Sequence, residues 1–134
     1  MKFLCLICAE RVMEHMTPQD ADRHFDEYRE FTDDIRENGH FVACNRLLPA
    51  DTAITLRVRN GKLSTTDGPF AETKEQVGGY YVIDARDLNE AIRVAARIPG
   101  AKHGCVEVRP IAEDEQTLRA LRIVDSGASH SISE

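Results

Sequence analysis

The order of apolar and polar residues along the chain predicts six strands. Residues 2–9 are almost continuously apolar, which is typical of a buried strand. Residues 52–59 instead alternate apolar and polar side chains, which indicates a half-buried strand. The dipeptide Asn60-Gly61 then favours a tight hairpin turn. The remaining strands are predicted at residues 40–44, 62–66, 80–84 and 105–110.

Two longer segments have the spacing of amphipathic helices. Thr17-Pro18 is typical of a helix start, and apolar residues then recur along one face until Gly39. A second helix is predicted from Asp87, its N-terminal cap, to Pro99. A short third helix is predicted within residues 113–122.

The order of these elements is strand, helix, strand, hairpin, strand, helix, strand. It predicts an α+β fold of the ferredoxin-like type, with two helices on one face of an antiparallel sheet. Since two helices cover only one face, we expect a second copy of the chain, and hence a homodimer, on the other face. We assign residues 1–112 to one domain and residues 113–134 to a short helix and a flexible tail.

Composition and charge narrow the class of partner. The chain has 134 residues and a net charge of −6, and its basic residues do not cluster, so we expect no nucleic-acid partner. No apolar run reaches the roughly 18 residues of a membrane-spanning helix. We therefore expect a cytoplasmic protein that does not enter a membrane.

The cysteines and histidines do not suggest a metal centre. Cys5 and Cys8 form a C-x-x-C motif, but residues three apart in a strand point to opposite faces and cannot hold one ion. No two histidines have the spacing of a metal-binding pair. We expect reduced thiols, no metal and no cofactor.

The segment DGPFAETKE contains the densest group of polar candidates. We expect Asp67-Gly68-Pro69 to form a turn and Phe70 to anchor that turn in the core. Asp67 is also a candidate acid or base in a pocket. Glu72 and Lys74 are either solvated charges or contacts to an anionic substrate.

The strands supply further candidates for substrate binding. Arg57 and Arg109 occupy polar positions, where a guanidinium would bind a carboxylate or phenolate through two hydrogen bonds. Cross-strand ion pairs or subunit contacts explain these arginines as well. Gly78-Gly79 favours a bulge or a close approach of backbones, and one of the two following tyrosines, Tyr81, is a candidate to offer its hydroxyl to a ligand.

Residues 66–110, with DGPF-x-E-x-KE followed by GGYY, resemble the DGPF-domain branch of the YCII-related proteins. The resemblance implies a dimeric α/β-barrel arrangement, in which two sheets pack face to face around a shared cavity. Some relatives are similar to lyases that eliminate halide from hydroxylated rings, and the wider superfamily includes isomerases. Members of this branch are often paired genetically with alternative sigma factors, which implies a regulatory setting.

The enzymatic branch of that family uses a histidine on the first helix with a nearby aspartate. When the end of the helix is matched to the family, the histidine position falls on Glu27, and His24 lies almost one turn earlier. The chain thus departs from the family pattern. We take His24, Glu27 and Asp67 as candidate catalytic residues, with His24 as the general base.

Two functions fit these residues. The first is a cofactor-free lyase or isomerase that acts on a small anionic or aromatic compound in a dimer cavity. The second is a noncatalytic dimer that binds a small ligand or has a regulatory role linked to an alternative sigma factor.

Overall fold

The computed structural model describes residues 1–9, 16–71 and 75–124. Their order is β1, α1, β2, a hairpin of β3 and β4, β5, α2, β6 and α3, with single-turn helices η2 and η3 before β3 and β6. The bounds are β1 Lys2–Ala9, α1 Pro18–Glu37, β2 Phe41–Arg46, η2 Ala50–Thr52, β3 Ile54–Arg59, β4 Lys62–Asp67, β5 Gln76–Asp84, α2 Leu88–Ala95, η3 Pro99–Lys102, β6 Gly104–Pro110 and α3 Glu115–Ala120.

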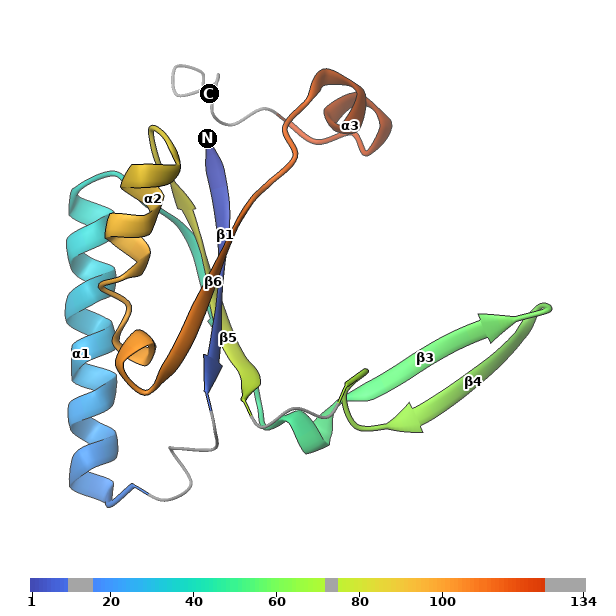
Figure 1. Ribbon diagram of the computed structural model, residues 1–134, viewed down its shortest axis with the longest axis horizontal. Coiled ribbons are helices and arrows are strands. Elements are labelled where there is room, and N and C mark those ends of the chain that lie inside the picture. Colours follow the sequence, from blue (N-terminus) through green and yellow to red (C-terminus); the bar gives the residue numbers. More distant parts are fainter. Residues whose placement is uncertain (10–15, 72–74, 125–134) are drawn as a thin grey trace.

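The main sheet has four antiparallel strands in the order β2-β5-β1-β6. Helices α1 and α2 lie together on one face of this sheet (Figure 1). With the β3–β4 hairpin set aside, this is the ferredoxin-like arrangement. The predicted fold class is therefore confirmed.

Local capping explains where the two long helices begin. The Thr17 hydroxyl accepts a hydrogen bond from the backbone N–H of Asp20 at 3.1 Å, and Pro18 occupies the first helical position. The Asp87 carboxylate accepts from the N–H of Glu90 at 2.9 Å. Gly39, with a φ of 82°, follows the end of α1 and allows the chain to turn toward β2. Both predicted helix starts are confirmed.

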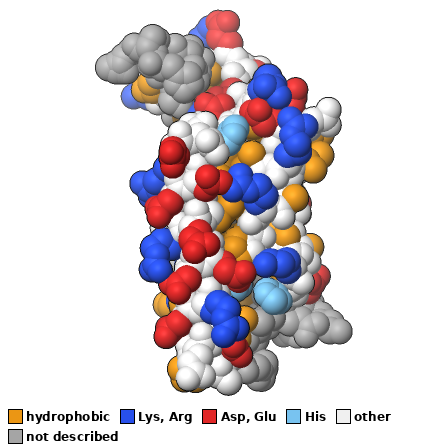
Figure 2. All heavy atoms as spheres, turned by 90° about the vertical axis from the view of Figure 1, so that its left-hand side faces the viewer, with side chains coloured by type: hydrophobic (Ala, Val, Ile, Leu, Met, Phe, Trp, Pro, Cys, Tyr) orange, Lys and Arg blue, Asp and Glu red, His pale blue; other side chains and the backbone are white. Residues whose placement is uncertain are grey.

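The core lies between the helices and the sheet. Alternate residues of the central strands point into it, so Phe3 and Cys5 of β1 meet Tyr81 and Ile83 of β5. The helices contribute Phe31, Ile35, Ala91, Val94 and Ala95. Away from the core, acidic side chains outnumber basic ones along α1, as the outer face in Figure 2 shows.

The opposite face of the main sheet, which we call the open face, has none of the described helices packed along it. Leu4, Leu6 and Val82 point toward this side and are half-buried. Glu107 and Arg109 of β6 form an ion pair there. Both α3 and the β3–β4 hairpin extend from this side of the sheet (Figure 1).

The hairpin of β3 and β4 forms a separate two-stranded sheet that projects from the body (Figure 1). We call it the arm, residues 54–67. Its antiparallel pairing and its Asn60-Gly61 turn, with positive φ at both residues, are as predicted. The predicted half-burial of β3 is wrong, because Ile54, Leu56 and Val58 are 60% to 63% exposed. Alternating apolar and polar residues show that a strand has one apolar and one polar face, but they do not show whether either face is covered.

The DGPF segment follows the arm directly. Gly68 has a φ of 98°, a conformation that favours glycine, so this part of the predicted turn is confirmed. Phe70 does not anchor the turn in the core as predicted, because its side chain is 82% exposed. The motif therefore ends in an aromatic side chain that no described residue covers.

The thiols of the C-x-x-C motif lie on opposite faces of β1, as predicted. Cys5 is buried on the helix side, whereas Cys8 is half-buried and lies directly opposite Cys105 of β6. Burial raises the pKa of Cys5 to about 11. Within the described ranges, no three His, Cys, Asp or Glu side chains are close enough to hold a metal ion. None of the described helices is both long and apolar enough to cross a membrane.

Candidate functional site

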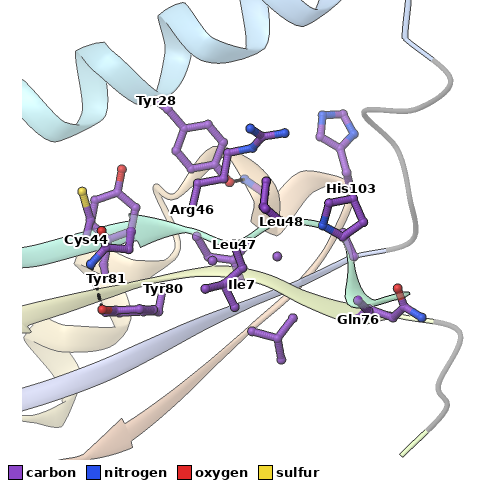
Figure 3. Close-up of a pocket in the computed structure, with 18 of the residues that line it drawn as sticks. Ile7, Tyr28, Cys44, Arg46, Leu47, Leu48, Gln76, Tyr80, Tyr81 and His103 are labelled. Atoms are coloured by element: carbon purple, nitrogen blue, oxygen red, sulfur yellow. Dashed lines mark hydrogen bonds between the residues drawn. The ribbon is translucent and has the colours of Figure 1, made fainter. Parts of the chain in front are cut away.

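A cavity of about 330 Å³ lies between the N-terminal half of α1 and one end of the main sheet (Figure 3). We call it the α1 cavity. Its volume is in the range of pockets that bind small molecules. Its walls are mainly apolar and aromatic, and its polar side chains include His24, Asn45, Arg46, Gln76 and His103.

His24 is the side chain of the α1 cavity best suited to proton transfer. It lies in the second turn of α1, and its ring meets those of Tyr28 at 5.0 Å and His103 at 5.6 Å between centroids. Its Nδ1 atom is buried and has no hydrogen-bond partner among the described residues. An unsatisfied buried nitrogen costs free energy, which a bound ligand could recover.

The surroundings of His24 keep its imidazole neutral. Burial, and then the neighbouring His103, lower the pKa of His24 below its usual value of 6.5. Glu27 opposes this effect, because its Oε1 lies 3.9 Å from Nδ1 of His24. The same carboxylate binds Lys102 at 3.1 Å, and this hydrogen bond lowers the pKa of Glu27. A neutral imidazole beside a carboxylate can accept a proton at neutral pH.

Two tyrosines form a rigid wall beside His24. The Tyr28 hydroxyl accepts a hydrogen bond from the backbone N–H of Gly100 at 3.0 Å, and burial raises its pKa to about 12. Thr32 donates its hydroxyl proton to the Tyr28 carbonyl, so the Tyr81 hydroxyl, 2.7 Å away, donates to Thr32. Both phenols are therefore neutral and held in place.

Arg46 brings a positive charge to the rim of the cavity. It comes from the last position of β2, and its guanidinium lies over the Phe25 ring at 5.5 Å. No carboxylate within the described ranges forms an ion pair with it. The side chain can therefore bind the anionic group of a ligand, while Phe25 positions the guanidinium through a cation–π contact.

Two glycines allow the walls to approach one another. A Cβ at Gly79 would lie 2.9 Å from the Asn45 carbonyl oxygen, which confirms the predicted close approach of backbones at this motif. A Cβ at Gly100 would lie 2.6 Å from both the Tyr28 hydroxyl and Cγ2 of Ile7. Larger residues here would push the cavity walls apart.

The structure brings only some of the predicted site residues together. His24 and Tyr81 line the α1 cavity, and Glu27 lies beside His24. Three other candidates are not among the lining residues: Arg57 and Asp67 are exposed on the arm, and Arg109 pairs with Glu107 on the open face. Glu72 and Lys74 lie outside the described residues.

Sequence reasoning did not single out several cavity residues. Phe25 and Tyr28 belong to the apolar stripe of α1, where helix spacing predicts core rather than pocket. Arg46 is the last residue of β2 and His103 follows η3, and no local pattern distinguishes them from solvated residues. The folded chain alone brings these positions next to His24.

The fold and the site define a class: a ferredoxin-like α+β chain with a histidine-containing cavity beneath its first helix. The chain belongs to the YCII-related family, since the sequence profile of the YCII-related domain matches residues 1–115. It is also similar to an uncharacterised protein of Rhizobium meliloti (strain 1021), with 45% identity over 78 residues. That match covers 57% of this chain and 63% of its relative.

The lowered pKa of His24 predicts a dependence of stability on pH. Because the unfolded chain takes up a proton at a higher pH than the folded chain, the free energy of unfolding should fall as pH drops below about 6.5. His24→Gln removes this contribution and should flatten the profile relative to wild type. Urea denaturation at about pH 7.5 and about pH 5.5, on either side of the ordinary histidine pKa, measures the pH dependence of both proteins.

Charged and titratable groups around His24 also affect its pKa, so they must be the same in the proteins that are compared. His103, Lys102 and Glu27 surround the ring, so the three are kept unchanged in the His24→Gln variant. His40→Gln removes a histidine outside the cavity and serves as the matched control. If the lower pH reduced the free energy of unfolding equally in wild type and in His24→Gln, the pH dependence could not be assigned to His24.

Proposed function

We propose that this YCII-related protein is a cofactor-free lyase or isomerase that moves a proton on a small anionic or aromatic compound in the α1 cavity. The observation that carries the proposal is His24, a largely buried imidazole of lowered pKa with an unpartnered Nδ1 at the wall of the cavity. Titratable groups perturbed in this way, inside a pocket, are typical of functional sites.

The cavity suits a ligand with one ring and one anionic group. Its volume of about 330 Å³ is at the lower end for small-molecule pockets. Tyr28 and Phe25 offer aromatic surface, and Arg46 offers a cation for a carboxylate or phenolate. The substrate class is therefore a small hydroxylated or carboxylated ring compound.

The proposed reaction begins with proton transfer to the neutral imidazole of His24. In an elimination, the electrons of the broken bond form a new double bond, and a leaving group such as halide departs with its own bonding electrons. The proton then passes from His24 to water. In an isomerisation, His24 returns the proton to another atom of the same substrate. Glu27 would stabilise the imidazolium formed in between.

Assay of halide release from a panel of halogenated dihydroxybenzenes tests this function. In His24→Asn we expect turnover to fall by about 10²- to 10⁴-fold, the usual contribution of a general base. Arg46→Gln should mainly raise KM, since it removes ligand binding. His40→Asn, outside the cavity, is the control. If His24→Asn retained wild-type turnover, His24 would not be the base.

The resemblance in sequence motivates a different location, a cavity shared by two copies and lined by Asp67, Arg57 and Arg109. The same assay separates the two locations. Loss of turnover in Asp67→Asn or Arg109→Gln, with His24→Asn active, would assign the reaction to the shared cavity. The opposite result would assign it to the α1 cavity.

Ligand binding without turnover is the second candidate function. One observation favours it: the nearest charged partner of His24, Glu27, lies 3.9 Å away and is bound to Lys102, so no hydrogen-bonded His–carboxylate pair exists among the described residues. A halogenated dihydroxybenzene that bound, shifted the His24 NMR signals and remained unchanged would support this function. Co-purification with an alternative sigma factor would test the regulatory link.

A further inference from the structure

We propose that Cys8 and Cys105 form a redox-active thiol pair, which a hydroperoxide oxidises to a disulfide between β1 and β6. The two residues lie directly opposite one another in the antiparallel pairing of these strands, and the register of that pairing is regular from Phe3 to Ala9. Directly opposite residues of such a pair have Cα atoms about 4.5–5.5 Å apart, which falls within the roughly 4.4–6.8 Å that a disulfide spans. The backbone therefore already has the spacing that a disulfide requires.

The two side chains also point the same way. Cys8 and Cys105 both lie on the open face, because cross-strand partners share one face of a sheet. Their thiols are within hydrogen-bonding reach of one another. The other two cysteines, Cys5 and Cys44, have tyrosine or valine as their cross-strand partners. Of the cross-strand pairs that the structure describes, this one alone consists of two cysteines.

Exposure and hydrogen bonding give the two thiols different roles. Cys105 is exposed, so an oxidant in solution can reach it. Its thiol donates to Oε1 of Glu75 at 3.9 Å, and this carboxylate can accept the proton when the sulfur attacks. Cys8 is half-buried, and burial, followed by the neighbouring thiol of Cys105 and two carboxylates, raises its pKa. Cys8 therefore stays protonated until Cys105 has reacted.

The oxidation takes place in two steps. The sulfur of Cys105 attacks the hydroxyl oxygen of the hydroperoxide, the O–O bond breaks, and an alcohol leaves with the proton from Cys105, which is now a sulfenic acid. The sulfur of Cys8 then attacks that of Cys105, the S–O bond breaks, and hydroxide takes the Cys8 proton and leaves as water. The two thiols lose two electrons and two protons in total, and the hydroperoxide is reduced to the alcohol and water.

The disulfide would lie directly behind the wall of the α1 cavity. Ile7 and Ala9, on either side of Cys8, line that cavity from the other face of β1. His103, which also lines it, lies two residues before Cys105. A bond between residues so far apart in sequence restricts the unfolded chain and so stabilises the folded one. Oxidation therefore fixes the pairing of β1 with β6 at the end of the sheet where the cavity lies.

Treatment of the reduced full chain with hydrogen peroxide, followed by peptide mass spectrometry without a reductant, tests the proposal. Wild type should lose two of its four thiols and contain peptides linked through Cys8 and Cys105, lighter by two hydrogens. Cys105→Ser should form no such link. Cys44→Ser removes a half-buried cysteine outside the pair, so it is the matched control and should form the link as wild type does.

Two further measurements separate the roles of the thiols and check the geometry. In Cys8→Ser the sulfenic acid of Cys105 has no thiol to react with, so its labelling by the 1,3-diketone dimedone should rise at least about tenfold above that of wild type. The Tm of oxidised wild type should exceed that of the reduced protein by at least about 5 °C. Circular dichroism measures the Tm and shows that the serine variants are folded.

Three results would overturn the proposal. The first is a wild-type chain that keeps all four thiols, or in which Cys105 is oxidised without forming a bond to Cys8. The second is a disulfide that joins two chains or includes Cys5 or Cys44. The third is a disulfide between Cys8 and Cys105 that lowers the Tm, which would mean that the strands must distort before the two sulfurs can meet.

Discussion

Ile35→Ala is expected to lower the free energy of unfolding by about 2–5 kcal/mol, the largest effect we predict for a single substitution. Ile35 is fully buried, on the face of α1 that packs against the sheet. Truncation removes apolar contacts and leaves a cavity that the neighbouring side chains fill only in part. The better helix propensity of alanine offsets only a few tenths of a kcal/mol.

Ile92→Ala is the matched control for this prediction. It is the same substitution on a helix, but Ile92 is 49% exposed. We expect a loss below about 1 kcal/mol, since little apolar surface is taken from the core. Urea denaturation of both variants gives the two values. Similar losses would mean that the burial of α1 and α2 differs from that described.

Gly104→Ala is expected to lower the free energy of unfolding by about 1–3 kcal/mol. The cause of this loss is purely steric. A Cβ at Gly104 would lie 2.1 Å from the Cys8 carbonyl oxygen and 2.8 Å from Cα of Ala9. These are backbone atoms of the neighbouring strand β1, so no side chain can rotate away. The two strands must separate at this end, beside His103 and the α1 cavity.

Gly78→Ala separates this steric effect from the general effect of replacing glycine in a strand. Gly78 also lies in the main sheet, but a Cβ there would have no neighbour within 4 Å. We expect no loss and a gain of up to about 1 kcal/mol, because alanine restricts the unfolded chain. If both variants were equally stable, β1 and β6 would not approach as closely as the structure shows.

Much of the fold could be predicted because its signals are local. Thr17-Pro18, Asp87 and Asn60-Gly61 each specify a cap or a turn through their own backbone hydrogen bonds and allowed φ angles. The run of apolar residues in 2–9 likewise predicted β1 with its bounds. These features need no information from distant parts of the chain.

Features that depend on distant parts of the chain were predicted less well. Leu88 and Ile92 recur with Ala91 and Ala95 at the spacing of one apolar helix face, yet Leu88 and Ile92 are about half exposed, at 48% and 49%. Ala91 and Ala95, which belong to the same predicted apolar face, are buried together with Val94, because short side chains let α2 lie close to the sheet.

The residues of the candidate site also divide into those that the sequence identifies and those that only the folded chain brings together. His24 could be selected from the sequence because a histidine beside a helix stripe is chemically distinctive. Arg46 and His103 could not, since a strand end and a loop converge on α1 only in the folded chain. Asp67 and Arg57 were grouped with His24 on chemistry, but the arm holds them on a separate sheet.

The position of β1 in the sheet has a consequence for how the chain folds during synthesis. Of the described strands, β1 is synthesised first and is central, and Leu4 pairs with Val82 on one side and Arg109 on the other. Both partners are made much later, so the apolar strand stays unpaired through most of translation. Pairing over such sequence distances slows folding. The apolar strand β1 therefore gains its second sheet partner only after β6 has been synthesised.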